Sequence, residues 1–222
     1  MNCITEPCAV GSVLACLIGT TQRTNFFIVH FPSPCDIKNI MILLEKELEC
    51  KIMYTSYMKV IIYTDGSSRG NPGNGGWSAI VMTPDEVIEL GGREDMTTNN
   101  RMELMGAIQG LKEVEGEKSK IQEVEICTDS QYVKKGMSEW IDGWIKKGWI
   151  GSTKKPVLNK DLWQELKKEE DRLKTAGMKV TWTYVPAHVG VVMNERADTI
   201  ATMCADASHL QLYRGERSGY TV

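Results

Sequence analysis

The sequence lacks the cysteine pattern of a disulfide-rich or zinc-binding protein. Its seven cysteines are odd in number and irregularly spaced, and no Cys-x-x-Cys pair occurs. It also lacks a segment that would cross a bilayer, since the apolar stretch at residues 8–19 is too short and has no basic start of a secretory signal. These absences predict a cytoplasmic protein with no membrane partner.

Internal repeats and low-complexity runs are absent too, and the composition is that of a globular protein, with 42% hydrophobic and 25% charged residues. The net charge of −3 gives no sign of a nucleic-acid partner, but the charge is unevenly distributed. Residues 134–160 contain seven lysines against two acidic residues, a local charge of +5 that leaves −8 for the rest. This basic patch, more than the total charge, decides which ligands the surface attracts.

Residues 1–57 differ in composition and hydrophobic pattern from the rest of the 222-residue chain. They predict an extension, or a small accessory segment, with a strand at residues 26–31 and an amphipathic helix from Asp36. The alternative is that Met53 or Met58 is the true start, and that the extension is weakly ordered or not made.

Residues 58–213 have the regular pattern of a compact domain, and residues 214–222 would be a C-terminal tail. Strands are predicted at 59–65, 76–83, 86–93, 121–128 and 178–185, and helices at 99–114, 130–136, 137–147, 160–174 and 194–207. This order predicts an α/β fold whose five-stranded mixed sheet has three antiparallel strands followed by parallel strands, flanked by helices. We expect a monomer, since no interface pattern is evident.

Two predicted strands end on the same pair of residues, Thr64-Asp65 and Thr128-Asp129. Ligands in open α/β sheets gather beyond the carboxyl ends of parallel strands, so these carboxylates indicate one shared metal site. The alternative is structural: Asp65 would serve a turn, and Asp129 would cap a helix that starts at Ser130.

Two further carboxylates lie on the inward faces of predicted helices. Glu103 belongs to the apolar stripe of its helix, and Asp198 shares a face with Ala201. A buried carboxylate needs a positive partner. Arg101 is the structural candidate for Glu103, whereas a divalent cation shared with the two strand-end aspartates would neutralise the whole group.

Hard oxygen ligands select Mg²⁺, or Mn²⁺ as a substitute, over zinc. Four carboxylates suit a two-metal site, whose ions lie roughly 3.5–4 Å apart. His188, in a predicted loop before Asp198, would transfer protons or assist the release of charged product there. Taken alone, it would be an ordinary surface histidine.

Four ordered motifs resemble bacterial-type type 1 ribonuclease H, over about residues 59–213. They are Thr64–Trp77, Thr97–Glu103, Thr128–Val133, and His188 with Asn194–Asp198. What this resemblance implies is a magnesium-dependent endoribonuclease that hydrolyses the RNA strand of RNA–DNA hybrids by two-metal-ion cleavage, leaving 5′-phosphate and 3′-hydroxyl ends. It implies catalytic, metal-binding roles for Asp65, Glu103, Asp129 and Asp198, and a catalytic role for His188.

The resemblance also implies two sets of substrate contacts. Polar side chains near the acidic site would read the 2′-hydroxyls of the RNA, namely Asn71, Asn99, Asn100 and Gln131. A basic protrusion at Met137–Lys155 would bind the substrate with Trp140, Trp144, Lys146 and Lys147, and its lysines would contact the phosphates of the DNA strand. The structural alternatives are a turn for Asn71, a helix cap for Asn99, and simple burial for the two tryptophans.

The chain departs from many relatives at Pro186-Ala187, where they have Lys-Gly, and residues 1–57 show no likeness to the hybrid-binding domain of many eukaryotic relatives. Two other functions stay open. One is a hybrid-binding scaffold without turnover, which the intact acidic set disfavours. The other is a different phosphoryl-transfer enzyme of the same fold, such as an integrase, which would not need the Asn99-Asn100 pair or the protrusion.

Overall fold

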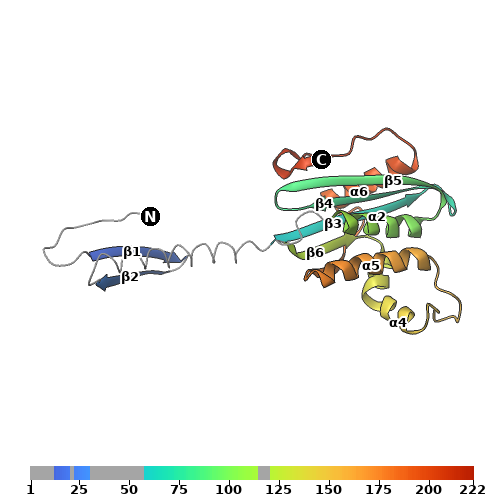
Figure 1. The fold of residues 1–222 in the computed structure, drawn as a ribbon. Coiled ribbons are helices and arrows are strands. Elements are labelled where there is room, and N and C mark those ends of the chain that lie inside the picture. Colours follow the sequence, from blue (N-terminus) through green and yellow to red (C-terminus); the bar gives the residue numbers. More distant parts are fainter. Residues whose placement is uncertain (1–12, 21–22, 31–57, 115–120) are drawn as a thin grey trace. The chain divides into compact units, whose positions relative to one another are not determined.

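A computed structural model describes residues 13–20, 23–30, 58–114 and 121–222 (Figure 1). The chain divides into two compact units, Met1–Ser56 and Tyr57–Val222. In the first unit, β1 (Val13–Thr20) and β2 (Arg23–His30) form an antiparallel hairpin. The strand expected at residues 26–31 is part of β2, whereas β1 was not foreseen. The helix expected from Asp36 lies outside the described residues.

The second unit is built on a six-stranded sheet of order β7-β6-β3-β4-β5-β8. Its strands are β3 (Met58–Ser68), β4 (Gly73–Met82), β5 (Glu86–Thr97), β6 (Ile121–Thr128), β7 (Lys179–Tyr184) and β8 (Arg214–Glu216). Strands β3, β6 and β7 are parallel, and β3, β4, β5 and β8 are antiparallel neighbours. The predicted mixed α/β fold is therefore confirmed.

The sixth strand, β8, corrects the predicted strand count. It comes from residues 214–222, which were expected to form a tail, and its Arg214 to Glu216 pair with Ile88 to Glu86 of β5. Tyr220 beyond it packs against the buried residues of the domain. A three-residue strand is too short for an alternating pattern to reveal it in the sequence.

Helices cover both faces of the sheet. On one face lie α2 (Asn99–Glu113) and α5 (Lys160–Thr175), and on the other lies α6 (Val192–Ala205). The strands serve both faces by alternation: Ala79 and Val81 of β4 face α2 and α5, while Ile80 and Met82 face α6. No helix in the described ranges is long and apolar enough to span a membrane.

One helical run follows β6 where two helices were expected. It comprises α3 (Gln131–Lys135), a π-helical turn (Gly136–Trp140) and α4 (Ile141–Lys146). A Cβ on Gly136 would collide with the indole ring of Trp163 in α5. The run therefore packs closely on α5 at this glycine.

Candidate active site

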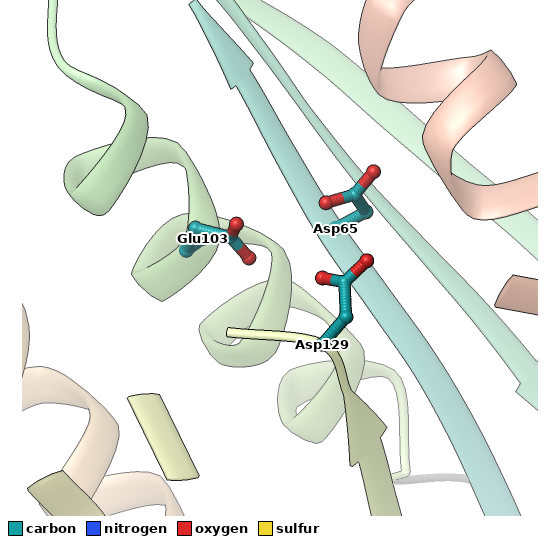
Figure 2. A group of neighbouring side chains, drawn as sticks. All are labelled: Asp65, Glu103 and Asp129. Atoms are coloured by element: carbon teal, nitrogen blue, oxygen red, sulfur yellow. The ribbon is translucent and has the colours of Figure 1, made fainter. Parts of the chain in front are cut away.

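Three carboxylates from three different elements converge at the end of the parallel strands (Figure 2). Asp65 of β3, Glu103 of α2 and Asp129, just after β6, each offer an oxygen, and these oxygens lie within 4.8 Å of one another. Asp65 and Glu103 are buried, and Asp129 is half-buried. These three oxygens are close enough to ligate one cation together.

The place where parallel pairing stops explains why Asp65 and Asp129 meet. The β3–β6 ladder ends at the pair Thr64 and Thr128, so the next residue on each strand is the aspartate. However, β3 does not end at Asp65 as predicted. It continues to Ser68, because β4 pairs with it as far as Gly75 opposite Ser68.

The structural alternatives for these aspartates are not supported by the hydrogen bonds. The N-cap of α3 is Ser130, whose hydroxyl accepts from the Val133 N–H, so Asp129 is not the cap. Asp65 does accept a hydrogen bond of 2.7 Å from the Gly66 N–H, but within a strand that continues. Both carboxylates therefore keep oxygen lone pairs that can bind a cation.

Two glycines allow α2 to bring Glu103 to the strand. A Cβ on Gly66 would collide with the backbone nitrogen of Glu103, and one on Gly106 would press on the carbonyl oxygen of Ser78. Any larger residue at these positions would push the helix away from β3. The Asp65-Gly66 pair therefore supplies both a carboxylate and the space for the next one.

Asp198 of α6 adds a fourth carboxylate beside this group. Beyond the effect of burial, its charge raises the pKa of Asp65 and also that of Glu103. It is half-buried and lies outside the set of oxygens within 4.8 Å. The hydroxyl of Ser78 donates to the carbonyl of Ala197 at 2.8 Å, which ties α6 to β4 next to Asp198.

Mutual repulsion in this cluster alters the protonation of its members. Burial first, and then the charge of Asp129, raises the pKa of Asp65 to about 8. Burial also raises the pKa of Glu103 well above its ordinary value, with the charges of Asp65 and Asp129 adding to the effect. Without a cation, the site therefore holds protons near neutral pH.

No cationic side chain in the described ranges partners Glu103. Arg101, the structural candidate, instead pairs with Asp161 at 3.0 Å and lies 3.8 Å from Glu94. Glu103 is 5% exposed, and its Oε2 has no hydrogen-bond partner. A buried, unpaired carboxylate oxygen among three other carboxylates fits a divalent cation with hard oxygen ligands.

Asn194 belongs to the site but was not singled out from the sequence. It is 2% exposed, and its Nδ2 donates to Asp129 Oδ2 at 3.2 Å, while its Oδ1 is buried without a partner. The signal was available, since Asn194 lies four residues before Asp198 and so on the same face of α6.

The predicted proton-transfer residue, His188, lies in an exposed loop between β7 and α6. It has a left-handed backbone with φ of 56°, and Gly190 in the same loop has φ of 84°. The Gly190 N–H donates to Glu195 of α6 at 3.0 Å, which ties the loop to the helix that carries Asp198.

The residues expected to contact RNA are all exposed: Asn71 in the β3–β4 turn, Asn99 and Asn100 in the first turn of α2, and Gln131 at the start of α3. Asn99 is not the helix cap, because Thr98 takes that place. Its Nδ2 instead donates to Glu103 Oε1 at 3.3 Å, so it touches the acidic cluster directly.

The basic protrusion is anchored by an aromatic cluster. Trp144 packs between Trp140 and Trp163, with ring centroids 5.7 and 5.3 Å away, and Tyr132 contacts Trp140 and Trp163. Trp140 and Trp144 are half-buried, so part of each ring is exposed. They line a groove of about 490 Å³ together with Lys147, while Lys146 and Lys147 are both exposed.

Comparison with known proteins places the chain in a family. The model of the RNase H family matches residues 57–206, more than half of the chain. The ribonuclease H of Marinobacter nauticus is 50% identical over 143 residues, which cover 64% of this chain and 91% of that protein. The ribonuclease H of Chromohalobacter salexigens is 44% identical over 162 residues, covering 72% and 93%.

A solved structure agrees with these sequence relatives. LC9-RNase H1, described as a type 1 RNase H with the type 2 active-site motif, superposes with a TM-score of 0.60 at 26% identity, over 71% of this chain and 77% of that one. The fold, the acidic cluster and the sequence relatives lead to one conclusion. The chain belongs to the ribonuclease H family, and it is an endoribonuclease that hydrolyses the RNA strand of RNA–DNA hybrids.

Proposed function

We propose that Asp65, Glu103, Asp129 and Asp198 hold the divalent cations of this enzyme, with Mg²⁺ as the natural ion and Mn²⁺ as a substitute. The observation that carries the proposal is the convergence of three carboxylates within 4.8 Å around a buried, unpaired Glu103 Oε2. A donor set made only of carboxylate oxygens favours these hard cations over zinc.

In the proposed reaction, the oxygen of a water molecule attacks the scissile phosphorus and the bond to the 3′-oxygen breaks. The water gives up a proton and the 3′-oxygen gains one, so the products carry a 5′-phosphate and a 3′-hydroxyl. Bound divalent cations supply the activation of water and neutralise the charge that develops on the phosphate. His188, in its exposed loop, takes part in the proton transfer.

We assign the recognition of RNA to Asn71, Asn99, Asn100 and Gln131. All four are exposed, and Asn99 contacts the acidic cluster through Glu103. An amide side chain both donates and accepts hydrogen bonds, as a 2′-hydroxyl does. The contact of Asn99 with Glu103 links this recognition to the catalytic group.

The DNA strand is assigned to the groove of Trp140, Trp144 and Lys147, with Lys146 beside it. Lys146→Gln/Lys147→Gln should raise the KM for the hybrid by about 10-fold, leave kcat unchanged and flatten the dependence of log Kd on log salt by about 1 for each lost phosphate contact. Lys154→Gln/Lys155→Gln, a matched loss of exposed charge nearby, should do less. Equal effects of the two double variants would refute this assignment.

The activity is tested with four end-labelled duplexes of one sequence: RNA–DNA, RNA–RNA, DNA–DNA, and DNA with a single ribonucleotide. We expect cleavage of the RNA strand of the hybrid alone, with Mg²⁺ but not with chelator. Asp129→Asn should bind the hybrid and not cleave it. Cleavage by Asp129→Asn at the parental rate would overturn the site, and hybrid binding without any parental cleavage would favour a scaffold.

The role of residues 1–57, the monomeric state and the cytoplasmic location each have a test of their own. A version that begins at Met58, assayed beside the full chain, reports whether residues 1–57 contribute to activity. Light scattering tests the expected monomer, and fractionation tests the cytoplasmic location.

A further inference from the structure

Helix α6, which carries Asp198, packs on the sheet through small residues. Ala197, Ala201 and Ala205 are buried along it, and a Cβ on Gly76 of β4 would collide with the carbonyl oxygen of Ala201. Backbone lies almost directly on backbone there, and Ile200 and Cys204 add apolar packing, which is not directional. Directional polar contacts therefore add to this packing in fixing the position of Asp198.

The strongest of these contacts is a bidentate ion pair between α6 and β5. Arg196 donates from Nε to Glu89 Oε1 at 2.7 Å and from Nη2 to Oε2 at 2.9 Å. The Glu89 side chain is completely excluded from solvent. A planar fork on a buried carboxylate fixes direction as well as distance, and it acts only two residues from Asp198.

The C-terminal segment donates two further hydrogen bonds to Glu89. Tyr220 donates its hydroxyl to Oε1 at 2.7 Å, and the Tyr213 N–H donates to Oε2 at 2.9 Å. Each carboxylate oxygen thus accepts two hydrogen bonds. The two tyrosine rings also pack together, with centroids 5.0 Å apart. The buried Glu89 carboxylate is thus fully hydrogen-bonded, although Arg196 and Tyr220 are themselves partly exposed.

The far end of α6 has a second, exposed fork. Arg69 pairs with Asp206 through two contacts of 2.6 Å. Arg69 also lies within electrostatic range of Asp198 and belongs to the turn that carries Asn71. A substitution there would mix several effects, so the Glu89 end gives the cleaner test.

We infer that Glu89, Arg196 and Tyr220 form a positioning network for Asp198. By holding α6, the network fixes the position of Asp198 relative to Asp65 and Asp129. It thereby determines the affinity of the site for divalent cations. The inference rests on the proposed function, because it requires Asp198 to be a ligand. The three residues act through α6 and do not touch the reacting atoms.

The test compares Arg196→Lys, which keeps the charge but loses the fork, with Tyr220→Phe, which removes one hydrogen bond. Calorimetry without substrate should show Mn²⁺ binding about 10-fold weaker in Arg196→Lys and about 3-fold weaker in Tyr220→Phe. Cleavage should need correspondingly more metal, with the KM for the hybrid unchanged.

Tyr213→Phe is the matched control. It removes a hydroxyl from the same segment, one that donates to the Glu216 carbonyl, but keeps the backbone N–H on Glu89. We expect its metal affinity to equal that of the parent. If Arg196→Lys and Tyr220→Phe lower only Tm and leave metal affinity and kcat unchanged, the network has a purely structural role. That result would overturn the inference.

Asp198→Asn separates this inference from the function on which it rests. If Asp198→Asn binds Mn²⁺ and cleaves like the parent, the assignment of Asp198 as a ligand fails, and the inference fails with it. If Asp198→Asn loses both properties while Arg196→Lys keeps them, only the positioning inference is overturned.

Discussion

Two buried glutamates of this enzyme have opposite surroundings. Glu89 accepts four hydrogen bonds, two of them from Arg196, and although burial opposes this, the bonds hold its pKa below the ordinary value. Glu103 accepts one from Asn99 and keeps an unpaired oxygen, and burial raises its pKa. The protein neutralises Glu89 with its own Arg196, whereas we propose that Glu103 is neutralised by a cation from solution.

The comparison predicts that the two glutamates contribute to folding with opposite sign. A lowered folded pKa means that Glu89 stabilises the fold above its ordinary pKa, and that this stabilisation is lost as the pH falls. A raised folded pKa means that Glu103 and Asp65 destabilise the metal-free fold as the pH rises. Substitutions at the two places should therefore move stability in opposite directions.

The largest effect is expected at the Glu89 network. Glu89→Gln leaves Arg196 without its carboxylate and should lower the free energy of unfolding by about 3 kcal/mol. Thermal unfolding measures this loss, because Tm falls by about 2–4 °C for each kcal/mol. Glu113→Gln, which breaks an ion pair with the 57%-exposed Arg214, should change it by less than about 1 kcal/mol. Similar losses in both variants would remove the distinction.

The next effect concerns catalysis. Glu103→Gln should lower kcat by more than about 100-fold, while the KM for the hybrid stays near the parental value. Losing a residue that only supports a metal ligand typically costs about 10–100-fold in activity, and losing the ligand itself should cost more. Steady-state kinetics measures both constants, and Glu113→Gln at the other end of α2 is again the control. A variant with parental kcat would mean that Glu103 is not part of the catalytic group.

The smallest effect concerns pH. The pKa of Asp65 is raised from 3.8 to about 8, so between these values the folded, metal-free protein holds a proton that the unfolded chain has released. Stability in chelator should then fall as the pH rises from about 4 to 8. Asp65→Asn should flatten this slope and raise Tm at pH 8 by about 2–4 °C. An unchanged slope would contradict the raised pKa.

The acidic cluster was predictable because its signals are local. Thr64-Asp65 and Thr128-Asp129 each follow a β-branched strand, and Glu103 stands out within an apolar helical stripe. A carboxylate at such a place has few structural explanations, so short patterns were enough to bring these residues together.

The supporting contacts were not predictable, because they join distant parts of the chain. Arg196 and Glu89 are 107 residues apart, and Tyr220 and Glu89 are 131 apart. The continuation of β3 past Asp65 likewise depends on its pairing with β4, since glycines and serines have low strand propensity by themselves. The final strand β8 is defined only by its neighbour β5.

If the buried carboxylates bind a cation, the metal must compete with the protons that they hold. We would first titrate Mg²⁺ into the protein and into Asp65→Asn by calorimetry, near neutral pH and in two buffers of different protonation enthalpy. The parent should bind Mg²⁺ with release of protons, because the metal displaces them from the cluster, and Asp65→Asn should bind it more weakly and release fewer. Equal affinity in the two proteins, without proton release, would mean that these carboxylates are not a cation site.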